Sequence, residues 1–201
     1  MPELTLAENF RVPVDLYSLL TLDELAIPPV HPSATGMPTQ FMDWDRGLVS
    51  FRSGWQPDST FVVFDGAHRT PAAQGHAHDS GGHFSLSALG EYFAIDTGRY
   101  SIEQEHHNVV LVDGKSGNAG DGVSWISSFY QANLTGYWPG DFVDCAEVTS
   151  SQMSECYWAK RTLGLVKGGE APAYVFTVED INKDNDFHEF WWLLNVHPFS
   201  T

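Results

Sequence analysis

The chain has 201 residues, of which 42% are hydrophobic and 13% aromatic, and its formal net charge is −16. This apolar content is enough for a sizeable core and excludes disorder over most of the length. The acidic charge argues against nucleic-acid binding, which needs basic surfaces. No apolar run approaches the roughly 20 residues of a membrane helix. We therefore expect neither a nucleic acid nor a membrane as a partner.

The first 38 residues differ in pattern from the rest of the chain. Residues 15–27 carry Leu and Ile at helical spacing, which predicts a short helix. The Pro-rich segment 27–38 follows and is expected to be an extended connector. The sequence thus predicts a helical and linker segment over residues 1–38 and a β domain over residues 39–201.

From Thr39 onward, apolar segments alternate with turns that contain Gly, Asn or Asp, at intervals of about ten residues. This pattern is typical of an antiparallel sandwich. We expect an all-β fold, a large supersandwich-like antiparallel β-sandwich behind the short N-terminal helical segment. The apolar face of the last segment needs a partner, so we expect the chain to be a fragment of a longer protein. The expected strands cover residues 39–44, 47–54, 59–66, 83–90, 91–98, 108–115, 124–131, 134–140, 141–149, 156–167, 173–181 and 188–196.

Two cysteines, Cys145 and Cys156, lie in expected strands on either side of the polar segment 150–152. A turn centred on that segment would place them opposite each other. Such a pair allows a disulfide, and a disulfide would imply an oxidising compartment. Two reduced thiols in the core agree equally well with the sequence.

Histidines gather in the segment from residue 75 to residue 114, which contains five of the nine. The strands expected at 83–88 and 91–96 form a hairpin, so the residues before the first and at the end of the second share one end of the sheet. His78 and Asp96 occupy those positions, and His107 directly precedes the next strand.

Two imidazoles and a carboxylate suit a borderline cation such as zinc. The sequence therefore predicts His78, Asp96 and His107 as metal ligands. His106 is an alternative to His107, because a hairpin argument does not resolve a shift of one residue.

Other interpretations of these histidines are weaker. Histidines beside glycines in a loop are often solvated, and Asp96-Thr97-Gly98 has the composition of an ordinary turn. A cupin-like metal enzyme also uses a His-x-His pair and would hold iron or manganese. It needs a Glu a few residues further on, where this sequence has Ser80-Gly81-Gly82-His83-Phe84.

Four segments resemble the central β-sandwich domain of heparinase II/III-like polysaccharide lyases, over roughly residues 40–197. They are FRSGW (51–55), GHAHDSGGHFSLSALGEYFAIDTGRY (75–100), HHNVVLVDG (106–114) and VEDI (178–181). The family pattern places an Asp two residues after the second His, whereas here Asp79 directly follows His78.

This resemblance implies a function. Family members join the sandwich to an N-terminal α/α toroid and cleave uronic-acid polysaccharides, such as heparan sulfate or alginate, by β-elimination. Zinc at His78, Asp96 and His107 would then be structural rather than catalytic, and His76 would be the catalytic imidazole that faces the substrate. The toroid would supply the Tyr and His that transfer protons.

The resemblance further implies an anionic uronate polysaccharide or oligosaccharide as partner, and a periplasmic or secreted protein. A homodimer is compatible with the sequence. Arg52 and Tyr100 are candidates for substrate binding. The competing interpretations are a stacked surface pair for Arg52, which lies near Trp55, and a half-buried loop aromatic for Tyr100. The alternative function is a non-catalytic carbohydrate-binding or structural sandwich that holds a structural metal.

Overall fold

The computed structural model describes residues 30–66, 78, 80–98, 103–115, 132–149, 156–169 and 172–196. The helix expected over residues 15–27 and the strand expected over 124–131 lie outside these residues. Contacts divide the chain into two units, Met1–Met37 and Pro38–Thr201. In the described part of the chain, no helix is long and apolar enough to cross a membrane.

The described part of the first unit contains one turn of 3-10 helix, η1 (Pro32–Ala34). An extended connector was expected here, so this detail of the prediction is wrong. The turn forms because Pro32 fixes φ at a helical value at the first position. The ring of His31 accepts the backbone N–H of Ser33 and caps the turn.

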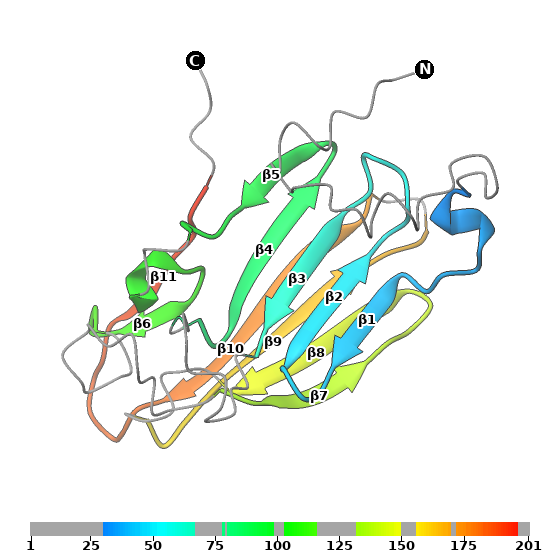
Figure 1. The fold of residues 1–201 in the computed structure, drawn as a ribbon. Helices are drawn as coiled ribbons and strands as arrows, with labels where there is room; N and C mark the ends of the chain where they lie inside the picture. Colours follow the sequence, from blue (N-terminus) through cyan, green and yellow to red (C-terminus); the bar gives the residue numbers. More distant parts are fainter. Residues whose placement is uncertain are drawn as a thin grey trace, which may run out of the picture. The chain divides into compact units, whose positions relative to one another are not determined.

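The second unit is built from antiparallel strands (Figure 1), and every strand falls within a segment where the sequence predicts one, apart from a residue at the end of the tenth. Within the described residues the strands form three sheets. The first has the order β1 (Gln40–Asp43), β2 (Leu48–Arg52), β3 (Phe61–Asp65), β4 (His83–Ala88), β5 (Glu91–Ala94). The second has the order β10 (Tyr174–Asn182), β9 (Trp158–Val166), β8 (Val143–Thr149), β7 (Leu134–Trp138). The third pairs β11 (Phe190–Trp192) with β6 (Val110–Val112).

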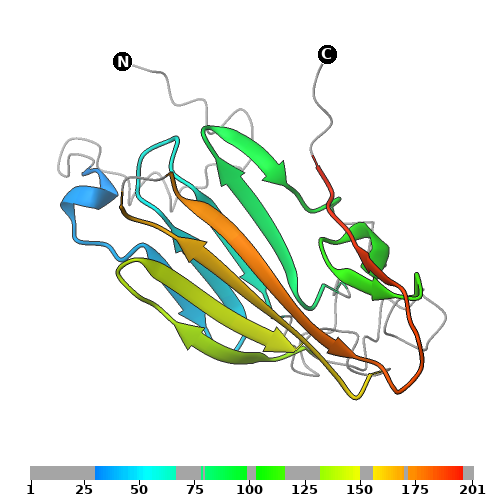
Figure 2. The ribbon, with the colours of Figure 1, turned by 180° about the vertical axis from the view of Figure 1, so that it is seen from behind.

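The core lies between the two larger sheets, which confirms the sandwich. Side chains on β2, β3, β8 and β9 alternate between buried and less buried positions, as the period of two in a strand requires. In Figure 2 the sheet of β7 to β10 lies in front of the sheet of β1 to β5. Burying each large apolar side chain contributes about 1.5–3 kcal/mol. The buried cluster contains Val49, Phe51, Val62, Phe64, Phe84, Ala94, Leu134, Ala146, Val148, Leu163 and Leu165.

The hairpin of β4 and β5 forms as predicted. Its turn residues Leu89 and Gly90 have φ of 56° and 79°, the left-handed pair that a two-residue hairpin with right-handed twist requires. The register shifts near Leu86, so that Phe93 is an extra residue on β5. Because of this bulge Ala94 points into the core while Phe93 stays exposed.

The predicted pairing of the two cysteines is wrong. Cys145 lies opposite Gly164 in the register of β8 and β9, and Cys145 and Cys156 form no disulfide. The observed register places Ala146 opposite Leu163. Pairing Cys145 with Cys156 would have placed Glu155 opposite Ala146 instead, facing the core. Burial of apolar side chains therefore sets the register.

A buried ion pair joins the two larger sheets at one end. Asp144 is fully buried, and the Nζ of Lys167 lies 2.5 Å from its Oδ2. The other oxygen of Asp144 accepts the backbone N–H of Gly140. Lys167 also donates to the hydroxyl of Thr39, just before β1, so the pair spans both sheets.

A second polar cluster fastens the connection between β10 and β11 to the end of β6. The Nδ1 of His188 is 2.8 Å from Asp113 Oδ2, and its Nε2 is 2.7 Å from Asp184 Oδ1. Lys183 Nζ lies 3.1 Å from the same oxygen of Asp113. Hydrogen bonds to Asp184 and Asp113 raise the pKa of His188 above its usual value. The backbone N–H of Glu189 and the ring of His188 lower the pKa of Asp113.

We expect Lys167→Met to lower the free energy of unfolding by roughly 3 kcal/mol, because it leaves the buried carboxylate of Asp144 without a countercharge. Urea denaturation measures this change. Adding Asp144→Asn to the same chain should recover most of the loss. A double variant less stable than Lys167→Met would contradict this assignment.

The His188 cluster should stabilise the fold in a defined pH window. A raised histidine pKa gives stability that is complete below about pH 6.5 and lost as pH rises through the folded pKa. The pKa values of Asp113 and Asp184 are lowered, so their contribution is present above about pH 4 and lost below it. His188→Gln should therefore destabilise most between about pH 4 and 6.5, as denaturation across pH would show. A loss that is constant from acid to alkaline pH would contradict this.

Candidate metal centre

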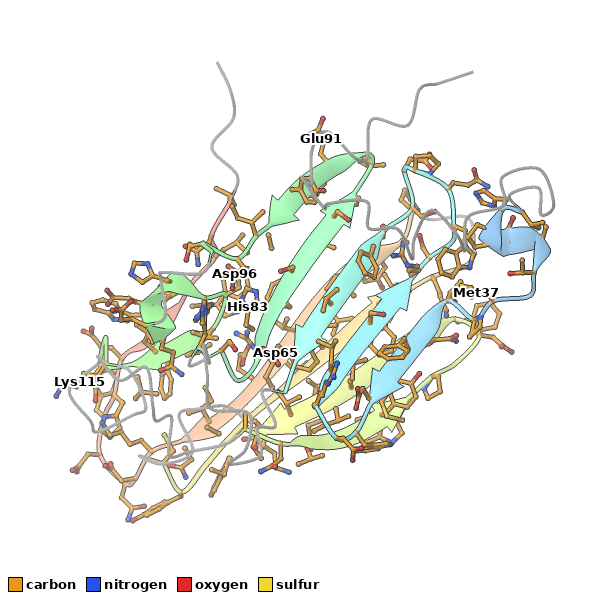
Figure 3. The ribbon with its side chains drawn as sticks, in the orientation of Figure 1. Met37, Asp65, His83, Glu91, Asp96 and Lys115 are labelled. Atoms are coloured by element: carbon orange, nitrogen blue, oxygen red, sulfur yellow. The ribbon has the colours of Figure 1, made fainter. Side chains whose placement is uncertain are left out.

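Three side chains with metal-binding atoms meet at the end of the sheet where β4 begins. One ligand atom from each of His78, Asp96 and His107 lies within 4.8 Å of the others. Asp96 follows β5, and His107 directly follows the 3-10 turn η3 (Gln104–His106). Figure 3 shows Asp96 beside His83 at this end of β4. The structure thus brings together the three residues that the sequence predicts as ligands.

His107 is the most constrained of the three, because its side chain is completely buried. Its Nδ1 lies 3.0 Å from Asp96 Oδ2. Its Nε2 is buried and has no hydrogen-bond partner among the described residues. The ring of His78 lies beside it, with centroids 5.3 Å apart. A buried ring nitrogen without a partner is costly, and a bound cation would satisfy it.

The protonation states of Asp96 and His107 suit cation binding. Burial lowers the pKa of His107, against the opposing effect of Asp96. Burial raises the pKa of Asp96. The backbone N–H of Gly98 and the nearby rings of His107 and His83 together lower it by more, so the net shift is downward. A neutral imidazole and an ionised carboxylate are the forms that coordinate a metal.

His83 belongs to the same cluster but is not available as a ligand. Its Nδ1 accepts the backbone N–H of Asn108 at 2.9 Å, so in the neutral ring the proton must be on Nε2. That nitrogen faces Ser85 Oγ at 3.2 Å and Asp96 Oδ2 at 3.7 Å. Burial, followed by the charge of His107, lowers the pKa of His83 to about 4. His83 is therefore a neutral ring that packs against the ligands and supports them.

Asn108 joins the surrounding segments through its side chain. Its Nδ2 donates to the carbonyls of Phe84 and Ile95 at 2.8 and 3.0 Å, and its Oδ1 accepts the N–H of Asn195 at 2.6 Å. Asn108 is completely buried. It therefore connects β4, the end of β5 and the segment after β11 directly beside His107.

The structure separates His106 from His107. The side chain of His106 is 41% exposed, and its Nε2 lies 3.6 Å from Glu103 and 3.9 Å from Glu105. Within the described residues the metal-binding group contains His107 and not His106. The sequence left this choice open.

Arg52 lies away from this centre. Its guanidinium packs over the rings of Phe61, at 3.7 Å from the centroid, and Trp55, at 4.8 Å. Arg52 pairs with Phe61 at the start of β3. Asp65, which pairs with His83, is four residues further along that strand, roughly 14 Å away at about 3.4 Å per residue. The structure therefore places Arg52 in a stacked cluster, and its contact with substrate stays a prediction. His76 and Tyr100 lie outside the described residues.

Arg161 is the residue near this centre that sequence reasoning missed. It lies on β9, and its Nη1 donates to the carbonyls of Gly82 and Asn108. A signal was present, because Arg161 shares the inward phase of its strand with Ala159, Leu163 and Leu165. A charged residue at an inward-facing position of a strand predicts that its side chain is buried and paired with polar groups.

Comparison with known proteins adds a fold likeness. No protein-family model matches the chain, and no curated protein matches it. Among solved structures, it is similar to a mutant of the heparan sulfate lyase HepC from Pedobacter heparinus, with a TM-score of 0.48 and 17% identity over 65% of this chain and 20% of that chain. It is also similar to a heparinase III, with a TM-score of 0.44 and 15% identity over 63% of this chain and 20% of that chain. The chain thus spans about a fifth of the length of these lyases, and identities this low show a likeness of fold alone.

Proposed function

We propose that the chain is the zinc-containing β-sandwich domain of a heparinase II/III-like polysaccharide lyase that cleaves uronic-acid polysaccharide by β-elimination. The observation that carries the proposal is the meeting of His78, Asp96 and His107 at one end of the sheet. These residues come from the same motifs that carry the family resemblance.

The donor set fits zinc. Two imidazoles and one carboxylate are ordinary zinc ligands, and the buried Nε2 of His107, which has no hydrogen-bond partner among the described residues, can offer its lone pair to the ion. The full burial of His107 favours a structural ion that holds the loops together. When bound, the zinc supplies positive charge that keeps its imidazole ligands deprotonated.

The residues of this chain would divide the work of β-elimination with another domain. The reaction needs the uronate carboxylate neutralised, the C5 proton removed and the departing oxygen protonated. His76 would hydrogen-bond to the carboxylate, since the pKa of an ordinary imidazole is near physiological pH. His76 is two residues from His78, so fixing His78 keeps the two Cα atoms within about 7 Å. The Tyr and His that move the other protons would come from the N-terminal toroid.

The acidic surface bears on the substrate. With a net charge of −16 the chain repels polyanions at long range, so the cations that attract the polysaccharide would come from the toroid. Moderately charged uronates fit this charge better than the most heavily sulfated ones. We propose a periplasmic or secreted location, where such polysaccharides are found.

The full burial of His107 also supports a second function, a non-catalytic carbohydrate-binding or structural sandwich with a structural metal. The two functions differ in whether His76 takes part in chemistry.

Purified chain should contain about one zinc per molecule, measured by plasma mass spectrometry. His78→Ala and His107→Ala should each abolish the bound zinc, because two protein ligands hold the ion poorly. His106→Ala is the matched control, since that neighbouring ring faces Glu103 and Glu105, and should leave zinc unchanged. Zinc that follows His106 instead of His107 would contradict the ligand set.

Lyase activity is tested on the full-length protein with its toroid, on a panel of uronate polysaccharides. The unsaturated product is followed by ultraviolet absorbance. His76→Ala should lower kcat by about 100-fold or more, the ordinary contribution of one positioned acid–base group, with zinc content unchanged. Normal turnover in His76→Ala would exclude the catalytic role and leave the non-catalytic function.

A further inference from the structure

Arg161 is a buried cation on β9, beside the end of the sheet where β4 begins. It extends from β9, its side chain is 2% exposed, and it is among the largest fully buried side chains of the described residues. Burying a guanidinium costs several kcal/mol unless it is paired and hydrogen-bonded. Its contacts therefore indicate what keeps it there.

The guanidinium has one partner of opposite charge and two carbonyl partners. Its Nε donates to Glu179 Oε1 at 2.7 Å, directly across from it on β10. Its Nη1 donates to the carbonyl of Gly82 at 2.6 Å and to that of Asn108 at 2.5 Å. Glu179 offsets the positive charge of Arg161, so this ion pair adds little repulsion toward a metal ion bound nearby.

The two carbonyls belong to the two segments that carry the histidine ligands. Gly82 ends the turn that follows His78, and Asn108 directly follows His107. No strand ladder connects these segments within the described residues, because β4 pairs with β3 and β5 while β6 pairs with β11. One nitrogen of Arg161 therefore bridges them from the opposite sheet.

We infer that Arg161 is a positioning residue for the metal centre, which holds Gly82 and Asn108 at the separation where His78 and His107 share one cation. This inference rests on the proposed zinc site. The planar fork of arginine reaches Glu179 and both carbonyls at once, whereas the single ammonium of lysine does not reproduce that geometry.

The test compares Arg161→Lys and Arg161→Gln with Lys167→Met in the full chain. Lys167 is the matched control, because it is also a buried cation, directly after β9, and its partners are Asp144 and Thr39. Zinc affinity is measured by competition with a chromophoric chelator, well below each unfolding transition. The visible spectrum of the cobalt(II)-substituted protein reports the ligand geometry.

Both Arg161 variants should bind zinc at least about tenfold more weakly and show a shifted cobalt spectrum, as is typical when a group that orients a ligand is removed. Lys167→Met should lose stability while its zinc affinity and cobalt spectrum match those of the unchanged chain. Wild-type affinity and spectrum in a folded Arg161 variant would overturn the inference and leave the zinc site intact. Unfolding of both Arg161 variants, or equal weakening in Lys167→Met, would overturn it by making the role of Arg161 structural alone. An unchanged chain that binds neither metal would overturn the proposed function and this inference with it.

Discussion

The arrangement of the candidate metal centre depends on the complete hydrogen bonding of Asn108. Each polar atom of this buried residue has a partner: its backbone N–H bonds to His83, its side chain to the carbonyls of Phe84 and Ile95 and the N–H of Asn195, and its carbonyl to Arg161. A buried polar atom without a partner costs about 1–3 kcal/mol. These bonds hold the segment before β6 to β4, to β9 and to the segments after β5 and β11, and they fix His107 next to Asp96.

In two histidine clusters of this fold the imidazole pKa values shift in opposite directions because their surroundings differ. His83 and His107 are buried, and desolvation lowers their pKa and favours the neutral ring. His188 has a carboxylate at each ring nitrogen, and its raised pKa favours the charged ring. In the first cluster the Nε2 of His107 has a lone pair to offer a cation, whereas His188 links β6 to the β10–β11 connection.

The sequence predicts the strands well because a period of two is visible in single segments, and the β4–β5 hairpin follows from the Leu89-Gly90 turn. Other features needed contacts between distant segments. The register that separates Cys145 from Cys156 is set by Ala146 against Leu163. The choice of His107 over His106 depends on how η3 packs, which no local pattern encodes. Arg161 was detectable as a cation in the inward phase of β9, but its partners were not.

The central claim is that His78, Asp96 and His107 together hold one zinc ion. Anomalous diffraction at the zinc absorption edge, on crystals of the chain grown with zinc, tests it most directly. We predict one strong peak at about 2.0–2.2 Å from a ring nitrogen of each histidine and from an oxygen of Asp96. A folded chain with no peak between these three side chains, or with zinc bound only elsewhere, would contradict the claim.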